Sequence, residues 1–150
     1  MQASHTRQTG VGLIEVMIAV LILAVGLLGI AALQSLTLKN SGASAERTQA
    51  VIQTYSMLDT LRAQRASAVA GSFNTTGTDF ECSTATALGT PGTRAGWLAD
   101  LRQTVASTAC GRVACATASG VTTCDIRVRW NETRATGGGE NATVQTTTRL

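Results

Sequence analysis

The sequence predicts an α+β protein in which one long N-terminal helix packs on a small antiparallel β-sheet. Three observations favour this fold class. An unbroken apolar run occupies residues 16–33, an amphipathic stretch with helical spacing follows it, and residues that alternate between apolar and polar fill the C-terminal part. With 150 residues the chain is long enough for one domain with an appendage, and too short for two well-cored domains.

Composition excludes several classes of protein. Charged residues make up 14% of the chain and aromatic residues 3%, so any core is small and mainly aliphatic. The net charge of +3 is far from that of a dedicated nucleic-acid-binding protein, and we expect no nucleic acid partner. The only histidine is His5, so the rest of the chain has no imidazole for a catalytic triad or a zinc site. We therefore expect a non-enzymatic protein without catalytic residues, metal or cofactor.

The apolar run at residues 16–33 has the length of a membrane-spanning helix. At 1.5 Å per residue it spans about 27 Å, close to the hydrocarbon core of about 30 Å. The alternative is a secretory signal peptide, whose apolar region is normally about 7–15 residues long. Cleavage near Ala32, after the run, would then release a soluble binding domain into the medium.

A charged residue and a glycine near the start of this run form a second signal. Glu15 is the one charged residue between Arg7 and Lys39, and a carboxylate in a lipid-spanning helix costs free energy unless it is paired or interfacial. It follows five residues after Gly10, which ends a short polar leader. Gly10 has no Cβ, so the backbone there can lie extended in a peptidase cleft. The simpler alternative for Glu15 is a place at the headgroup level, at the positive end of the helix dipole.

This arrangement resembles the class III signal of type IV prepilins and pseudopilins. The resemblance implies that a prepilin peptidase cuts between Gly10 and Val11 and that the new α-amine of Val11 is N-methylated. It also implies that Glu15 pairs with the N-terminus of a neighbouring subunit during assembly. The continuation at residues 25–34, VGLLGIAALQ, is similar to PilV-type minor pilins, the type IV pilus modification proteins.

Two glycines lie inside the apolar run, Gly26 and Gly29. Glycine lowers helix propensity by about 1 kcal/mol relative to alanine. Two interpretations stay open for this pair. It permits the local unwinding that the helix of the pilin family undergoes in filaments, or it lets neighbouring helices pack closely.

Beyond residue 38 the pattern becomes amphipathic, and we expect the helix to continue to residue 66. Apolar residues recur there at helical spacing: Val51, Tyr55, Leu58 and Leu61. This stripe predicts the helix face on which the sheet packs. The stretch Asn40-Ser41-Gly42 weakens the link between the two helical parts and indicates a bend.

The middle of the chain contains one further predicted helix. Residues 67–96 are rich in Ser, Thr and Gly and predict a long ordered loop with one short strand. Trp97, Leu101 and Val105 then follow at intervals of four, which predicts a short helix with one buried face. A similar W-x-x-x-L segment occurs in PilV-type proteins.

The cysteines predict a hairpin with a cross-strand disulfide. Ser119-Gly120 predicts a two-residue loop between strands at residues 112–117 and 121–130. That loop places Cys115 opposite Cys124 at a non-hydrogen-bonded pair, where side chains are closest. Four cysteines allow three disulfide connectivities. If Cys115 pairs with Cys124, the second disulfide is Cys82–Cys110 by elimination. Disulfides indicate a domain outside the cytosol.

The C-terminal part predicts two more features. Ile126, Val128 and Trp130 alternate with Arg127 and Arg129, which predicts a strand with one buried and one basic face. We expect a flexible connection at residues 134–141 and a last, edge strand at residues 142–150. Phosphate binding by Arg127, Arg129 and Arg134 is less expected than a solvated or subunit-facing surface. The three Asn-x-Thr matches, at residues 74, 131 and 141, are of the kind that a Thr-rich chain produces by chance.

We expect four segments: a prepilin leader at 1–10, an apolar assembly helix at 11–38, its amphipathic half at 39–66 and a globular head at 67–150. The resemblance implies a minor pilin that primes assembly of a type IV pilus near its tip, in motility, adhesion or DNA uptake. Its implied partners are the prepilin peptidase, the major pilin, other minor pilins and a tip adhesin. It implies an inner-membrane anchor with a periplasmic head before assembly, and the cell surface afterwards. A minor pseudopilin of a type II secretion system is the nearest alternative.

Overall fold

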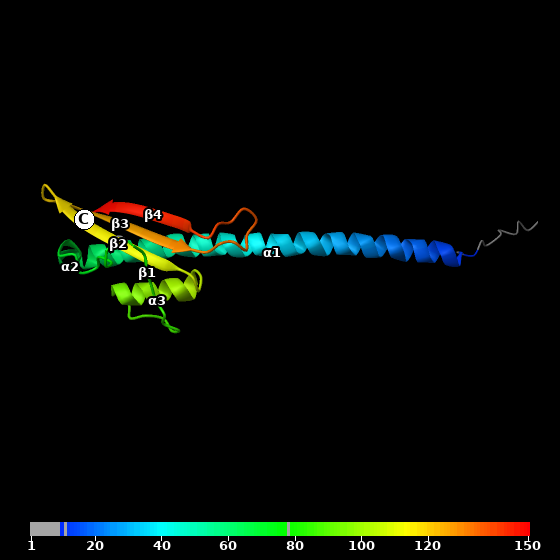
Figure 1. Cartoon of the computed structure of the whole chain (residues 1–150), viewed down its shortest axis with the longest axis horizontal. Helices are drawn as coiled ribbons and strands as arrows, with labels where there is room; N and C mark the ends of the chain where they lie inside the picture. The colour runs from blue at the N-terminus through cyan, green and yellow to red at the C-terminus, as the bar shows by residue number, and fades with distance from the viewer. Residues whose placement is uncertain (1–9, 11, 78) are drawn as a thin grey trace, which may run out of the picture. The chain divides into compact units, whose positions relative to one another are not determined.

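The computed structural model describes residues 10, 12–77 and 79–150 (Figure 1). Its elements in chain order are α1 (Leu13–Ala63), α2 (Arg65–Val69), β1 (Glu81–Cys82), α3 (Arg94–Thr104), β2 (Cys110–Ala118), β3 (Val121–Trp130) and β4 (Ala142–Arg149). The four strands form one antiparallel sheet in the order β1-β2-β3-β4. The predicted fold class is confirmed: a long N-terminal helix, a small antiparallel sheet and two disulfides, consistent with a type IV pilin-like α+β fold.

The chain divides into two units, one ending at Leu38 and the other comprising Lys39–Leu150. In the first unit every large apolar side chain of α1 is exposed, from 48% at Leu36 to 80% at Leu13. The most apolar stretch of α1 has a mean hydropathy of 3.0, so by length and composition this helix could cross a membrane. The predicted weak point at residues 40–42 is helical, like the residues on either side of it.

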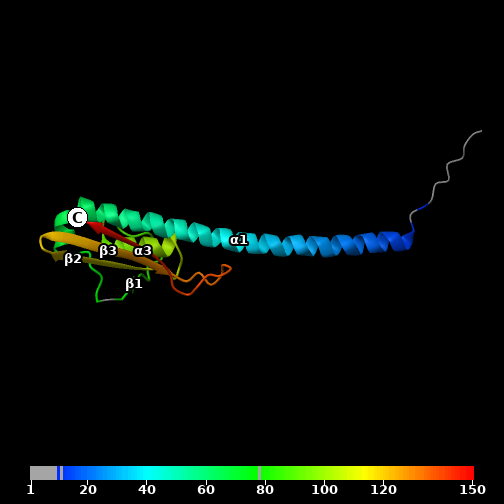
Figure 2. The same cartoon turned by 90° about the horizontal axis from the view of Figure 1, so that it is seen from above.

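The second unit has its core between the sheet and the part of α1 that belongs to this unit (Figure 2). This part of α1 buries one stripe of residues: Ala50, Thr54, Met57, Leu58 and Leu61. The prediction was right for Leu58 and Leu61. It was wrong for Val51 and Tyr55, which are 40% and 57% exposed.

The physical reason lies at Ala50 and Thr54, which sequence patterns treat as neutral. Both are fully buried, and the Thr54 hydroxyl donates a hydrogen bond to the Ala50 carbonyl at 2.7 Å. This bond satisfies the hydroxyl, so burial of Thr54 leaves no unpaired polar group. The small Ala50 side chain also occupies little space at the interface with the sheet. The buried face is therefore rotated away from the larger residues Val51 and Tyr55.

The sheet turns its apolar face to this core. Along β3, Cys124, Ile126, Val128 and Trp130 are buried, whereas Arg127 and Arg129 point to the opposite face and are half-buried. α3 packs on β2, where the Trp97 ring lies so close to Gly111 that a Cβ there would be 2.3 Å from it. The Trp97 indole N–H donates a hydrogen bond to the Gln53 carbonyl at 2.9 Å, which ties α3 to α1.

The hairpin register is the predicted one. β2 and β3 pair Ala118 with Val121 and Cys115 with Cys124. Ser119 and Gly120 have φ values of 50° and 77°, as a two-residue turn of the primed type requires. Disulfides join Cys115 to Cys124 and Cys82 to Cys110. The second disulfide fastens β1 to the start of β2, so it ties the middle loop to the sheet.

Several element boundaries differ from the prediction: β2 is longer than the expected 112–117, and two helix boundaries are displaced. The expected helix to residue 66 ends at Ala63, and the unexpected short helix α2 starts at Arg65. The helix expected at Trp97 begins at Arg94, because the Thr93 hydroxyl caps it by accepting a hydrogen bond from the Gly96 N–H at 2.9 Å. Pattern reasoning misses such starts because a cap carries no apolar periodicity.

The connection expected to be flexible, residues 134–141, is held by turn hydrogen bonds. The Ala135 N–H donates to the Glu132 carbonyl, and the Gly138 N–H donates to the Ala135 carbonyl. The Thr136 N–H also donates to the Asn40 side-chain oxygen on α1 at 3.0 Å. Glycine content alone does not show which hydrogen bonds a loop makes, and the flexibility of this connection stays a prediction.

Candidate functional site

The predicted processing signal lies at the start of α1. Gly10 is exposed, and Val11, the expected cleavage and methylation residue, lies outside the described residues. α1 begins at Leu13, and the Gly12 carbonyl accepts hydrogen bonds from the N–H groups of Glu15 and Val16 at 3.0 and 3.3 Å. Glu15 is therefore the third residue of the helix. The partial positive charge of the helix N-terminus stabilises a carboxylate at this position.

Glu15 is exposed, and no described residue pairs with its carboxylate. It lies on one helix face with Ala19 and Leu23, at intervals of four. The rest of this face and its neighbours are apolar. In lipid or in a helix bundle a carboxylate without a partner costs free energy.

The glycines of this segment have no packing role within the described chain. A Cβ added at Gly10, Gly12, Gly26 or Gly29 would have no neighbour within 4 Å. The described residues therefore give no steric reason for glycine at these positions.

The basic face of the sheet is largely occupied by its own contacts. Arg127 Nε lies 2.6 Å from Asp125 Oδ1, and the Arg129 guanidinium lies 4.4 Å from the centre of the Phe80 ring. Arg134 is exposed in the loop before β4. These contacts favour the expected reading of a solvated or subunit-facing surface over a phosphate site. Among the described residues no three His, Cys, Asp or Glu side chains gather as metal ligands would.

An ion pair that the sequence did not indicate links the loop after β3 to α1. Glu132 is 3% exposed, and both of its oxygens accept hydrogen bonds from Arg47, at 2.7 and 2.5 Å. These bonds raise the pKa of the Arg47 guanidinium further above its ordinary value. A lone acid in a loop gives no pattern by which this contact could be found in advance.

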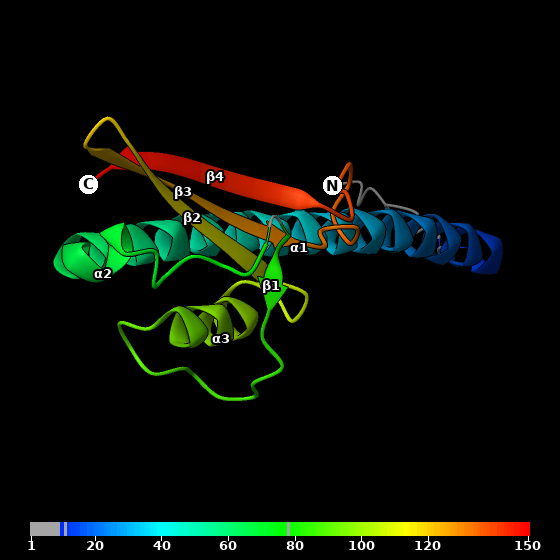
Figure 3. The ribbon, with the colours of Figure 1, turned by 60° about the vertical axis from the view of Figure 1, so that its left-hand side comes forward.

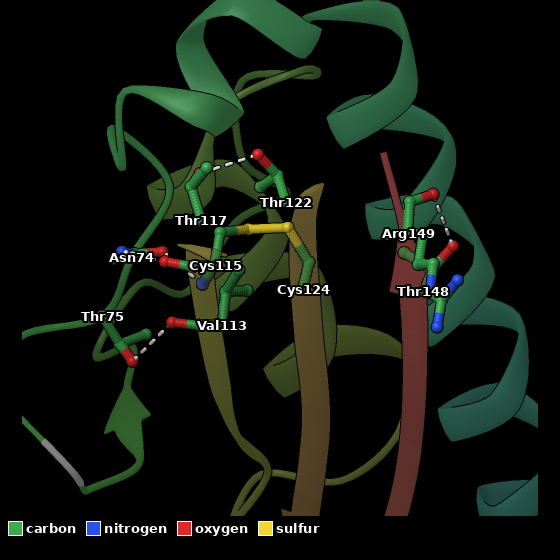
Figure 4. The surroundings of a disulfide bond; sticks show 9 residues. All are labelled: Asn74, Thr75, Val113, Cys115, Thr117, Thr122, Cys124, Thr148 and Arg149. Carbon is green, nitrogen blue, oxygen red and sulfur yellow. Dashed lines mark hydrogen bonds between the residues drawn. A yellow bond between two sulfur atoms is a disulfide. The ribbon is translucent and has the colours of Figure 1, made fainter. Parts of the chain in front are cut away.

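Two residues that the sequence did not indicate, Asn74 and Thr75, bond to the outer edge of β2 (Figure 4). The Asn74 side chain accepts from the Cys115 N–H at 2.7 Å and donates to the Cys115 carbonyl at 3.1 Å. Beside it, the Thr75 N–H and hydroxyl both donate to the Val113 carbonyl, at 2.9 and 3.1 Å. Asn74 and Thr75 thus act as a continuation of β1 along β2.

Glu81, the first residue of β1, accepts a hydrogen bond from the loop that precedes it. A hydrogen bond from the Thr76 N–H lowers the pKa of Glu81, against the smaller opposing effect of burial. Arg94, with its Nε 3.5 Å from the carboxylate, adds to this lowering. Ionised Glu81 in β1 therefore contacts both the preceding loop, through Thr76, and α3, through Arg94.

Comparison with known proteins agrees with the N-terminal signal. Residues 5–31 match the family model of the prokaryotic N-terminal methylation motif. No curated protein and no solved structure matches the chain. The chain therefore carries a type IV prepilin-like methylation motif, which supports a type IV pilin-like or pseudopilin-like protein. This motif indicates a structural subunit, processing by a prepilin peptidase and assembly with other pilins, and with the apolar helix it fits a membrane anchor.

Proposed function

We propose that this chain is a minor pilin of a type IV pilus, of the PilV type, which joins other minor pilins to prime filament assembly. The observation that carries the proposal is Glu15, an acid in the first turn of an apolar helix that matches the methylation motif, with no ion-pair partner among the described residues. A position at or near the pilus tip, beside a tip adhesin, completes this proposal.

The proposed processing separates a leader, residues 1–10, from the apolar helix that starts at Val11. A prepilin peptidase cuts after Gly10 on the cytoplasmic side, and the new α-amine of Val11 is methylated. The helix at 11–38 stays in the inner membrane, with the segments at 39–66 and 67–150 in the periplasm. The two disulfides support this side of the membrane, because disulfides persist in oxidising compartments.

The proposed assembly step pairs Glu15 with the N-terminal amine of a neighbouring subunit. Both groups become desolvated as the apolar helices come together, and each then satisfies the charge of the other. A subunit without the carboxylate would leave its neighbour's amine buried and unpaired. This arrangement fixes the axial position of one helix against the next.

Glu15→Ala tests the assembly step. We expect the variant to be cleaved like the parent and to be depleted at least tenfold from sheared surface pili, because the neighbour's amine loses its partner. Val16→Ala is the matched control, since it alters the adjacent position without removing a charge. Recovery of the Glu15→Ala protein in pili at the parent level would contradict the proposal.

A minor pseudopilin of a type II secretion system is the second candidate, because the methylation motif supports both classes. The location of the protein distinguishes them. We expect a pilin to appear in surface filaments sheared from cells, whereas a pseudopilin stays in the cell envelope. A release of the domain near Ala32 into the medium would support neither.

A further inference from the structure

The two edges of the sheet differ in how many of their outward backbone groups are hydrogen-bonded, and the strand register shows which groups point outward. The Leu150 N–H donates to the Thr122 carbonyl, so these two residues form a hydrogen-bonded pair of the β3–β4 ladder. Since such pairs recur at every second residue, the even-numbered residues of β4 turn their backbone groups toward β3. The odd-numbered residues therefore turn theirs outward: Thr143, Gln145, Thr147 and Arg149.

The opposite edge, formed by β2, is covered along most of its length. Its outward groups belong to Gly111, Val113, Cys115 and Thr117 by the same rule. β1 pairs with Gly111, Thr75 bonds to Val113, and Asn74 bonds to Cys115. Only the last of these positions, near the hairpin turn, has no such cover among the described residues.

β4 has no comparable cover. Within residues 39–150 no other element runs along the far side of β4 (Figure 3), and no described residue bonds to the outward backbone groups of Gln145 or Thr147. The strand also lacks the devices that block edge pairing, since it has no proline, no lysine and no charge before Arg149. The β2 edge is thus covered along most of its length, whereas the β4 edge is open at Gln145 and Thr147.

The charge around this edge indicates which strand it fits. The outer face of the sheet carries one acid, Asp125, and four arginines, which the register places on the same side: Arg112, Arg127, Arg129 and Arg149. Asp125 is already bonded to Arg127 and Gln145. A second copy of this chain would bring another basic face beside this one, which is unfavourable.

From this difference between the edges we propose that β4 binds an extended, acidic segment of a different protein, as a fifth strand antiparallel to β4. The outward N–H and C=O groups provide the main-chain bonds, as in other cases of strand addition. An acidic side chain opposite Arg149, the exposed arginine of β4, provides the charge match. Apolar side chains of the segment extend the core beside Val144 and Leu150, which are partly buried against it. This inference goes beyond the proposed function and does not rest on the N-terminal signal.

Amide hydrogen exchange of the full chain in detergent, resolved by residue, tests the proposal. The probe is the blocked peptide Glu-Val-Thr-Val-Thr-Val-Glu. In the free chain we expect the amides of Gln145 and Thr147 to exchange at least a hundredfold faster than that of Thr146. Saturating peptide should slow them at least tenfold. Equal protection of all three amides in the free chain, from self-association or another cover, would overturn the proposal, as would no effect of the peptide.

Two variants locate the binding. Gln145→Pro removes one outward N–H and leaves the β3 bonds of Val144 and Thr146 in place, so it should abolish peptide binding. Gln145→Ala keeps that N–H and loses the same side-chain bond to Asp125, so it should bind like the parent. Equal binding by the two variants would place the peptide elsewhere and overturn the proposal.

A charge exchange gives a test that does not depend on how proline is tolerated. The peptide with Lys in place of both Glu residues should bind the parent chain at least tenfold more weakly. Arg149→Glu should reverse this preference. If both chains bind the two peptides equally, the acidic character of the partner is wrong and the proposal falls.

Discussion

Arg47 and Glu132 are 85 residues apart in sequence and form a two-point ion pair, with Nε–Oε1 and Nη2–Oε2 distances of 2.7 and 2.5 Å. The pair is asymmetric, since the Arg47 side chain is 62% exposed and that of Glu132 is 2% exposed. It joins α1 to the loop that leads into β4. Water can solvate the Arg47 charge if the pair is broken, whereas the buried Glu132 carboxylate has little access to water.

This asymmetry predicts an order of stabilities. Arg47→Ala leaves a buried carboxylate without a partner, whereas Glu132→Gln leaves an arginine that water can solvate. We expect Arg47→Ala to lower the thermal midpoint of unfolding more than Glu132→Gln does. Thermal unfolding of the full chain, followed by circular dichroism, measures both. The opposite order would show that the pair does not hold the loop.

The same loop provides a prediction at two adjacent glycines. A Cβ at Gly138 would lie 2.0 Å from the Glu132 carbonyl oxygen, whereas one at Gly139 would have no neighbour within 4 Å. Gly138→Ala should therefore cost about 1–3 kcal/mol of unfolding free energy. Gly139→Ala is the control and should change it little. Equal effects in denaturant titrations would mean that the loop adjusts freely.

The disulfides differ in the length of chain that they close, with separations of 28 and 9 residues. The loop-entropy relation predicts that loss of Cys82–Cys110 costs about 1 kcal/mol more than loss of Cys115–Cys124. Paired Cys→Ala variants, compared by denaturant unfolding, measure the difference. The reverse order would indicate that packing of the sulfurs outweighs chain entropy.

Glu81 predicts a dependence of stability on pH. Its pKa is lowered in the folded chain, chiefly by the Thr76 N–H, so ionised Glu81 stabilises the fold above its ordinary pKa of 4.5. This contribution disappears as the pH falls through the lowered pKa. The parent should therefore be more stable than Glu81→Gln at pH 6, and the difference should vanish at strongly acidic pH. A difference that stays constant with pH would exclude this role.

Sequence patterns were sufficient where a local rule fixes the geometry. Ser119-Gly120 determines the β2–β3 register, and that register brings Cys115 opposite Cys124. The packing face of α1 was misplaced because burial at Ala50 and Thr54 depends on the space left by the sheet, which no periodicity encodes. Asn74 and Glu132 were missed for a related reason, since each contacts a residue more than forty positions away. The N-terminal signal was found from sequence because it is a local motif.

The most direct test of the central claim is the intact mass and N-terminal residue of the protein recovered from its native membrane. We predict a chain that begins at Val11, carries one added methyl group and retains the whole apolar helix. Accumulation of the uncleaved chain in cells without prepilin peptidase would identify the protease. A chain that begins near Leu33 would contradict the account, because it would lack Glu15 and the helix on which the proposed assembly depends.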